Sequence, residues 1–277
     1  MNDLVFAPAS KAQEQFLLSN AWLTIYGGAA FAGKSFCTLG SMLPIIGDPG
    51  TRACVVRKTT KMLSGGSGLF DAAIHLYSKI DPKMKIKTRD LTLVFSSGAE
   101  IQFTYLDKIA DRMNVQGKEF SRIAIDEGTQ LTMDNSFYLL SRLRSSRVKY
   151  PLRATITCNP DPSSYLYSFV EFLLDENKVP EHKEEYPTRY FVRNESGFHF
   201  YDTFEEANAN HPPSRQYGSP VKTYKFIPGK MNDLPQSVLD DNAGYISTLK
   251  QLPITESRRL LDGAWVHEQS SGFFKRD

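Results

Sequence analysis

The segment GGAAFAGKSF, residues 27–36, decides how the rest of the chain is interpreted. It fits the phosphate-binding loop pattern G-x-x-x-x-G-K-[ST], which begins at Gly28 and continues through Gly33 and Lys34 to Ser35. In such a loop, successive backbone N–H groups point inward and surround a phosphate group. The sequence therefore predicts a nucleotide-binding site at this position.

The residues on either side of this segment support the prediction. The apolar run WLTIY (22–26) precedes it and is typical of a strand. Phe36, Leu39 and Leu43 follow at helical spacing, and Pro44 ends the predicted helix. A strand before the loop and a helix after it are the context that the motif requires, which disfavours a chance match on a surface turn.

The loop residues have expected roles. Lys34 would bridge the β- and γ-phosphate oxygens, and Ser35 would ligate Mg²⁺. Phe31 stands at the tip of the loop, where its side chain can point away from the phosphates. The nucleotide-binding residues that we predict here are Gly28, Ala29, Ala30, Phe31, Ala32, Gly33, Lys34 and Ser35.

A second motif, IAIDEG (123–128), is an apolar strand that ends in two acids. We expect Asp126 to hold Mg²⁺, through water, and Glu127 to polarise the attacking water. Two acids at a strand end could also be solvated or cap a helix. Together with the loop, the catalytic interpretation is favoured, because a parallel sheet brings strand ends to one edge.

The segment TITCNP (155–160) is predicted to end the next strand at the same edge. There, Thr157 and Asn159 could sense the γ-phosphate or the attacking water. In a simpler interpretation, Asn-Pro only starts a turn.

The candidates for an adenine contact are Gln13 and Gln15. Both lie in SKAQEQFLLS (10–19), a predicted helix that Ser10 can cap. Gln13 already occupies the capping-box position, so the residues alone leave the adenine contact open.

Arginine side chains could stabilise the charge that develops on the transferred phosphate. The candidates are Arg142 and Arg144 in SRLR, and Arg112 in DRMNVQG. Each of them could instead lie on a solvated helix face.

The segment RKTTKMLSGGSG (57–68) combines basic residues with a glycine-rich stretch. Arg57, Lys58 and Lys61 could touch a nucleic-acid phosphate backbone. A solvated loop is the slightly favoured alternative.

Strands and helices alternate through about residue 170, which predicts an α/β fold with a mainly parallel sheet flanked by helices. Further elements are predicted as strands over 52–58, 121–127 and 153–160, a hairpin over 91–106 and a helix over 138–144.

The predicted organisation has three parts. Residues 1–177 form an ATPase core, and residues 178–265 form an insertion, a returning strand and a helical lid. The second part starts with a proline-rich polar stretch and contains an aromatic hairpin that turns at Asn194–Gly197. A strand over 222–228 and helices near 235–250 and 254–262 follow. The third part, residues 266–277, is a linker.

Composition excludes several classes of protein. The 277-residue chain is 41% hydrophobic and 23% charged with a net charge of +2, so it is not a polycation. Its three cysteines form no C-x-x-C pair, which favours a reducing compartment, and its histidines show no zinc-ligand spacing. No signal peptide and no apolar run of about 20 residues is present, so we expect a soluble intracellular protein without membrane contact.

Three segments together suggest a family. NVQGKEFSRIAIDEGTQL (114–131), YLLSRLR (138–144) and TITCNP (155–160), in this order, resemble the ATPase half of large terminase subunits of tailed bacteriophages, which are DNA-packaging motors. KAQEQFL (11–17) is similar to the adenine-reading segment of the family. RRLLDGAW (258–265) resembles the junction before its nuclease domain, so the resemblance spans about 8–274.

The resemblance implies an ASCE-type P-loop NTPase with a small C-terminal lid, using ATP and Mg²⁺. It implies that Lys34 and Ser35 form the Walker A pair. Asp126 is the Walker B residue, and Glu127 is the catalytic carboxylate. It also implies that Gln13 contacts adenine and that Thr157 and Asn159 couple hydrolysis to movement.

This chain departs from the family pattern at two places. Family loops often carry an arginine near positions 29–31, where this chain has Ala-Ala-Phe. Some members have an arginine before the glycine that precedes Walker B, where Gln116 stands here. Arg142 is therefore the first choice for the catalytic arginine finger and Arg112 the second.

The resemblance also implies partners. They are double-stranded DNA, a portal protein and a small terminase subunit, with a pentameric ring when assembled and a monomer possible in isolation. The expected location is the host cell cytoplasm, at the procapsid portal. Residues 266–277 would lead toward a nuclease domain that does not fit in this chain, so nuclease activity is not expected. The alternatives are a helicase-like nucleic-acid-stimulated NTPase and a non-catalytic, nucleotide-switched interaction module.

Overall fold

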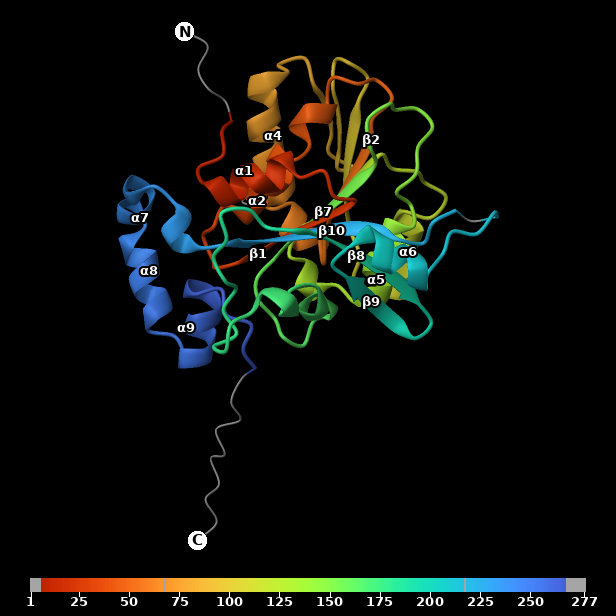
Figure 1. Ribbon diagram of the computed structural model, residues 1–277. Coiled ribbons are helices and arrows are strands. Elements are labelled where there is room, and N and C mark those ends of the chain that lie inside the picture. The colour runs from red at the N-terminus through yellow and green to blue at the C-terminus, as the bar shows by residue number, and fades with distance from the viewer. Residues whose placement is uncertain (1–5, 67, 217, 268–277) are drawn as a thin grey trace.

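The computed structural model describes residues 6–66, 68–216 and 218–267 (Figure 1). The predicted linker therefore lies almost entirely outside the described residues. In the described part, no helix is long and apolar enough to cross a membrane.

A mixed, mainly parallel sheet organises the molecule, as the sequence predicts. Its strand order is β3-β4-β5-β2-β6-β7-β1-β10-β8-β9. The central strands run parallel to one another: β5 (Glu100–Tyr105), β2 (Arg52–Arg57), β6 (Arg122–Ile125), β7 (Arg153–Cys158), β1 (Leu23–Gly28) and β10 (Lys222–Gly229). Antiparallel strands complete the two sides: β3 (Lys85–Lys87) with β4 (Thr92–Val94), and β8 (Thr188–Asn194) with β9 (Gly197–Tyr201).

Helices bury both faces of this sheet. Alternate residues of a strand point to opposite faces. Ala53 and Val55 accordingly join a core with α2 and α4, while Cys54 and Val56 join a larger core with α1 and α5. The helices are α1 (Lys11–Leu18), α2 (Lys34–Gly40), α3 (Thr60–Leu63), α4 (Leu69–Ile80), α5 (Met133–Leu140) and α6 (Phe204–Asn210).

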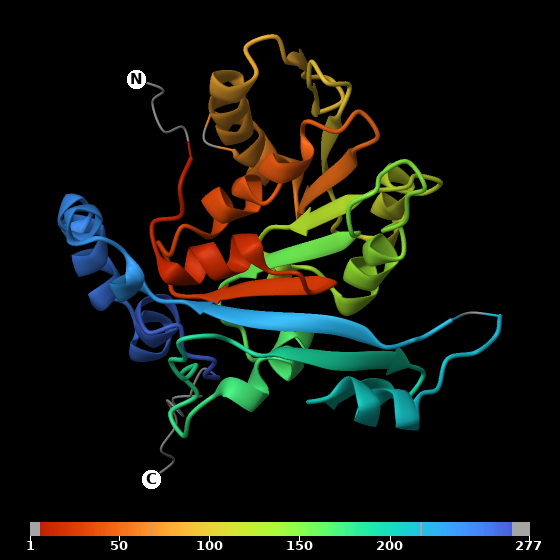
Figure 2. The same ribbon diagram turned by 45° about the horizontal axis from the view of Figure 1, so that its top comes forward.

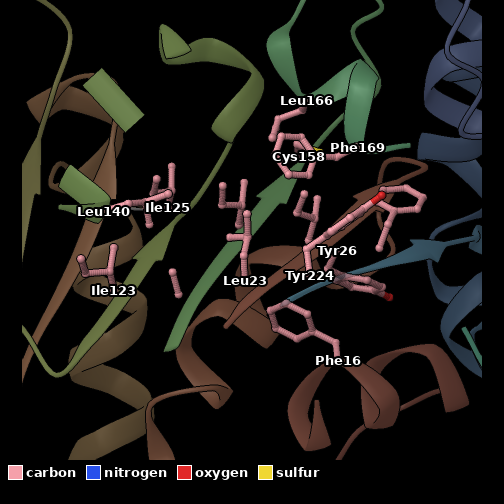
Figure 3. Close-up of a cluster of buried hydrophobic side chains, with 14 of the residues drawn as sticks. Phe16, Leu23, Tyr26, Ile123, Ile125, Leu140, Cys158, Leu166, Phe169 and Tyr224 are labelled. Carbon is pink, nitrogen blue, oxygen red and sulfur yellow. The ribbon is translucent and has the colours of Figure 1, made fainter. Parts of the chain in front are cut away.

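Figure 3 shows part of the larger core, where side chains distant in sequence meet. The ring of Phe169 is fully buried in it. Its ring centre lies 5.2 Å from that of Phe191, 5.0 Å from that of Phe198 and 5.2 Å from that of Tyr224. These edge-to-face contacts attach the β8–β9 hairpin to the sheet.

The structure confirms the two predicted hairpins but corrects some helices. β8 ends at Asn194 and β9 begins at Gly197, as predicted. The helix predicted over 138–144 instead spans Met133–Leu140, because Thr132 caps its start by accepting a hydrogen bond from the Asn135 amide. It ends early because the chain at Leu143 forms a bridge with Phe120. Helices α3, α4 and α6 were not predicted.

The C-terminal helices adjoin the predicted phosphate-binding loop, residues 27–36. The helix predicted near 235–250 is two helices, α7 (Gln236–Asp241) and α8 (Ala243–Lys250), and α9 (Ile254–Leu261) follows. These helices lie together beside one end of the sheet (Figures 1 and 2). β8, β9 and β10 continue the core sheet, so the boundary at 177/178 separates parts that share one sheet and stays a prediction.

We expect Phe169→Ala to lower the free energy of unfolding by about 3–5 kcal/mol, because it leaves a cavity among packed aromatic rings. Urea unfolding followed by fluorescence measures this change. Phe204→Ala is the matched control, since Phe204 begins α6 and its side chain is 44% exposed. Equal losses in the two variants would contradict the role of Phe169.

Candidate functional site

The loop after β1 has a backbone that requires glycine at both motif positions. A Cβ at Gly28 would lie 2.1 Å from the carbonyl oxygen of Gly229, and Gly33 has a φ of +72°. A Cβ at Gly33 would also lie 2.6 Å from Nε2 of Gln13. Phe31 has a φ of 66° at the loop tip, which is uncommon for a non-glycine residue. The chain therefore follows a tight path that ordinary side chains would block.

The amide groups of the loop divide into two sets. Ala29 N–H donates to Gly229 (2.8 Å) and Ala30 N–H donates to Leu260 (2.7 Å), which anchors the start of the loop. Within the described ranges, the amides of residues 31–36 have no hydrogen-bond acceptor. These amides precede and begin α2, where the helix dipole favours negative charge. The second set can therefore receive an anion.

Lys34 is a buried cation held by the loop itself. Its Nζ donates to the carbonyl oxygens of Gly28 (3.3 Å) and Ala29. Burial lowers the pKa of Lys34, and the negative charge of Glu127 is the largest opposing effect. An anionic ligand at the loop would supply the missing counter-charge.

Asp126 is fully buried and accepts hydrogen bonds from three hydroxyl groups. Ser35 Oγ donates to Oδ2 at 3.1 Å, and Thr38 Oγ1 donates to Oδ1 at 3.3 Å. Thr157 Oγ1 also donates to Oδ1. Sequence reasoning missed Thr38, although it lies one helical turn after Lys34 and so shares a face with the loop end.

Arg57 completes the surroundings of this carboxylate. Its Nε donates to Asp126 Oδ2 at 2.7 Å, and its Nη2 contacts the same oxygen and donates to Ser35 Oγ at 3.1 Å. From the sequence, Arg57 was expected either to touch a nucleic-acid backbone or to lie in a solvated loop, and not to contact Asp126. The strand register explains the contact. Val56 of β2 pairs with Ile125 of β6, so the next residues, Arg57 and Asp126, lie at the same edge of the sheet. Lys58 instead pairs with Asp107 at 3.7 Å.

Glu127 lies beside the loop in a left-handed conformation with a φ of 58°. Burial raises the pKa of its carboxyl, and the Asp126 charge raises it further. Lys34, Arg57 and Asn159 oppose that rise. Asn159 Nδ2 donates to Glu127 Oε2 at 3.0 Å, while Asn159 Oδ1 is buried without a partner among the described residues. The predicted meeting of these strand ends at one edge is confirmed.

A cavity of about 490 Å³ opens at this edge. Its polar lining comes from Gln13, Lys34, Ser35, Glu127 and Asn159. Its apolar lining comes from the loop and from the C-terminal helices, and includes Phe31, Val238 and Tyr245. The Phe31 and Tyr245 ring centres are 6.0 Å apart. The volume and the mixed lining suit a nucleotide-sized molecule.

The two glutamines predicted as adenine contacts lie in different surroundings. Gln13 is buried beside the loop, where Nε2 donates to Ala32 O (3.1 Å) and Oε1 accepts from Ala9 N–H (2.7 Å). Gln15 instead donates to Glu184 O at 2.7 Å, away from the cavity. The structure therefore brings Gln13, and not Gln15, to the site.

The predicted arginine fingers do not line the cavity. Their guanidinium carbons lie over one ring, that of Tyr138, at 5.1 Å for Arg142 and 4.9 Å for Arg112. The carbonyl of Arg142 accepts from Phe120 N–H, which places it before β6, at the edge opposite Asp126. Arg112 Nε donates to Asn135 Oδ1 at 2.9 Å. Within this chain, neither arginine is brought to the phosphate loop.

The donor set fits Mg²⁺. Ser35 Oγ and Asp126 Oδ2 are oxygen atoms of the kind that Mg²⁺ prefers, and they lie 3.1 Å apart beside the loop amides. Among the described residues, no group of three or more His, Cys, Asp or Glu could hold a metal without other ligands. Mg²⁺ in nucleotide sites needs only one or two protein ligands, because phosphates and water supply the rest.

Comparison with solved structures shows the same fold. The chain is similar to the large terminase ATPase domain of Thermus phage P74-26, with 14% identity, a TM-score of 0.57 and coverage of 92% of this chain and 93% of that one. It is also similar to the large terminase of a thermophilic bacteriophage, in complex with ADP (14% identity, TM-score 0.57) and with ATP-gamma-S (14% identity, TM-score 0.54). These two alignments cover 94% of this chain but only 54% and 53% of the longer chains.

No curated protein sequence matches the chain. A family model does match. It is described as terminase large subunit, T4likevirus-type, N-terminal, and it covers residues 25–277. The match includes the loop and the acidic strand end, while Gln13 lies before it. The chain therefore belongs to the large terminase subunit family of bacteriophages.

Proposed function

We propose that this chain is the ATP-hydrolysing motor domain that moves double-stranded DNA into a procapsid. One observation carries the proposal: Lys34, Ser35, Asp126, Glu127 and Asn159 converge at one sheet edge beside the same cavity. Membership of the terminase family supports the packaging role. The ADP and ATP-gamma-S complexes of the thermophilic phage terminase support a nucleotide as the ligand.

In this proposal, the unpartnered amides of residues 31–36 and the Lys34 ammonium bind the phosphates. Ser35 and Asp126 would hold Mg²⁺, which neutralises phosphate charge when bound. Phosphate binding gives buried Lys34 the counter-charge that it lacks in the free chain.

Glu127 orients the attacking water. Asn159 occupies Oε2 of Glu127 and so leaves Oε1 as the free acceptor. Asn159 Oδ1 also lacks a partner among the described residues, and we propose it as a second acceptor for the same water. Two acceptors can fix both hydrogens of one water molecule, which is the orientation that hydrolysis requires.

The base would lie against the apolar lining of the cavity. Phe31 and Tyr245 offer aromatic surfaces, and Gln13 lines the same cavity. One hydrogen of the Gln13 amide remains after its bond to Ala32. That hydrogen is the donor that we propose for the adenine ring.

A conformational change at the nucleotide site would be transmitted to the C-terminal helices α7–α9. Thr157 and Asn159 link Asp126 and Glu127 to β7, which we propose as the coupling segment. Ala30 is bonded to Leu260 at the end of α9, so the loop and the proposed lid are directly connected. Closure of α7–α9 over the nucleotide would then be transmitted to DNA.

Because Arg142 and Arg112 lie outside their own cavity, we propose that either acts on a neighbouring subunit. This requires the assembled ring, proposed as a pentamer, with the portal protein and the small terminase subunit as partners. The proposed location is the host cytoplasm at the procapsid portal. A monomer would then bind nucleotide but hydrolyse it slowly.

We expect Glu127→Gln to lower ATP turnover by about 10²- to 10⁴-fold, because the water loses its base, while ATP binding is retained. Phosphate release is measured over a range of protein concentrations, with and without duplex DNA. Turnover of the unmodified chain should rise faster than linearly with concentration. Glu205→Gln, at an exposed position on α6, is the control.

Full turnover by Glu127→Gln would overturn the assignment of the base. A labelled duplex distinguishes the motor from a helicase, because a packaging motor moves the duplex intact. Strand separation that depends on ATP would contradict the motor proposal.

We expect Asn159→Ala to move the acidic limb of the rate–pH profile to higher pH. The carboxylate form of Glu127 is the active form, so turnover rises with pH through its pKa. Burial already raises that pKa, and loss of the Asn159 side-chain hydrogen bond to Glu127 Oε2 should raise it further. Thr129→Ala is the control, since Thr129 bonds only the main-chain oxygen of Asn159. An acidic limb that stays in place would contradict this role of Asn159.

A further inference from the structure

Arg57 is the last residue of β2, and its guanidinium lies where the proposed metal ligands converge. It reaches Asp126 Oδ2 with both Nε and Nη2, and Nη2 also donates to Ser35 Oγ at 3.1 Å. One arginine thus bridges both side chains that would hold Mg²⁺. The contact is well shielded, since the Arg57 side chain is 16% exposed and that of Asp126 is 0% exposed.

These contacts use the whole acceptor capacity of Asp126 Oδ2, the oxygen next to Ser35. A carboxylate offers about four lone-pair sites. About two of these sites belong to Oδ2, which receives Nε and Nη2 of Arg57 and the hydroxyl of Ser35. Oδ2 therefore has no acceptor site left for a metal ion or for a metal-bound water. At least one donor must leave before this oxygen, together with Ser35 Oγ, can take part in metal binding.

Arg57 is the donor whose departure is easiest to compensate. It is the cation in this group, so an incoming cation replaces its charge next to the buried carboxylate. Its Nη1 also donates to Met62 O at 3.0 Å, in α3, which gives the guanidinium an attachment outside the site. The three hydroxyl donors carry no charge, and their release would not offset the arrival of a metal.

We propose that Arg57 is the resident counter-ion of the metal site. In the nucleotide-free chain it bridges Ser35 and Asp126, and the metal–nucleotide complex binds by displacing it. The inference rests on the proposed function, because that function assigns Mg²⁺ to these ligands. It further means that loading the site frees Arg57 next to α3, so the segment 57–63 changes its contacts when nucleotide enters.

The test measures binding of Mn²⁺, a paramagnetic substitute for Mg²⁺, by electron paramagnetic resonance. Mn²⁺ is titrated into the chain alone and with ADP. We expect Arg57→Gln to bind Mn²⁺ tighter than the unmodified chain by about tenfold or more, since losing even one competing charge-assisted hydrogen bond gives about that factor. Lys58→Gln removes the same charge from the next residue, which pairs with Asp107, and should bind Mn²⁺ as the unmodified chain does.

Two outcomes would overturn the proposal: unchanged or weaker Mn²⁺ binding by Arg57→Gln, or equal strengthening by both variants. The second would show a general effect of charge. Binding of fluorescent ADP without metal tests the proposed function separately. If no variant binds ADP, that function fails, while the titration of the nucleotide-free chain still decides the role of Arg57.

Thermal unfolding shows whether a change in Mn²⁺ binding is caused by a folding defect. Loss of Arg57 leaves Asp126 without its counter-ion, so Arg57→Gln should have a lower Tm in the absence of metal. Mn²⁺ should then raise its Tm more than it raises that of the unmodified chain. Arg57→Lys, which keeps the charge but makes fewer hydrogen bonds, should lie between them. Equal stabilisation of all three chains by Mn²⁺ would contradict the proposal.

Discussion

The buried carboxylate of Asp126 is the constraint on which the site depends. Ser35 and Thr38 approach it from α2, Arg57 from β2 and Thr157 from β7. An ionised carboxylate without exposure to water is stable only when it is paired and hydrogen-bonded. These bonds therefore fix the helix after the loop against the strand ends around it. The chemistry and the local stability of this edge rest on the same group.

The loop is also tied to the C-terminal part of the chain. Ala29 bonds the end of β10, and Ala30 bonds Leu260 at the end of α9. Gly263 is packed so closely that a Cβ there would lie 3.2 Å from the Ala29 amide nitrogen. A shift of α9 cannot leave the loop unaffected, because hydrogen bonds and close packing transmit it. This arrangement gives the proposed coupling between nucleotide and lid a direct physical route.

Much of the site could be predicted because its parts are local motifs placed by a general rule. The loop, Asp126 and Asn159 each follow a strand, and parallel strands end at one edge. The helical spacing from Lys34 was an available signal for Thr38, whereas the role of Arg57 could not be predicted, since it depends on which strand becomes the neighbour of β6. The same reason explains the shifted helix α5, whose end is set by the bridge between Leu143 and Phe120. Contacts between residues distant in sequence therefore determined the features that hydrophobic periodicity alone could not predict.

The distribution of positive charge connects these observations. Lys34 and Arg57 are the cations in contact with the described site, whereas Arg112 and Arg142 share the Tyr138 ring outside the cavity. Both guanidinium groups contact the Tyr138 ring through cation–π interactions. In the subunit ring that we propose, these arginines would meet the phosphates of a nucleotide bound by an adjacent subunit. Each chain would then supply Arg112 or Arg142 to the nucleotide site of its neighbour, in place of the arginine that its own site lacks.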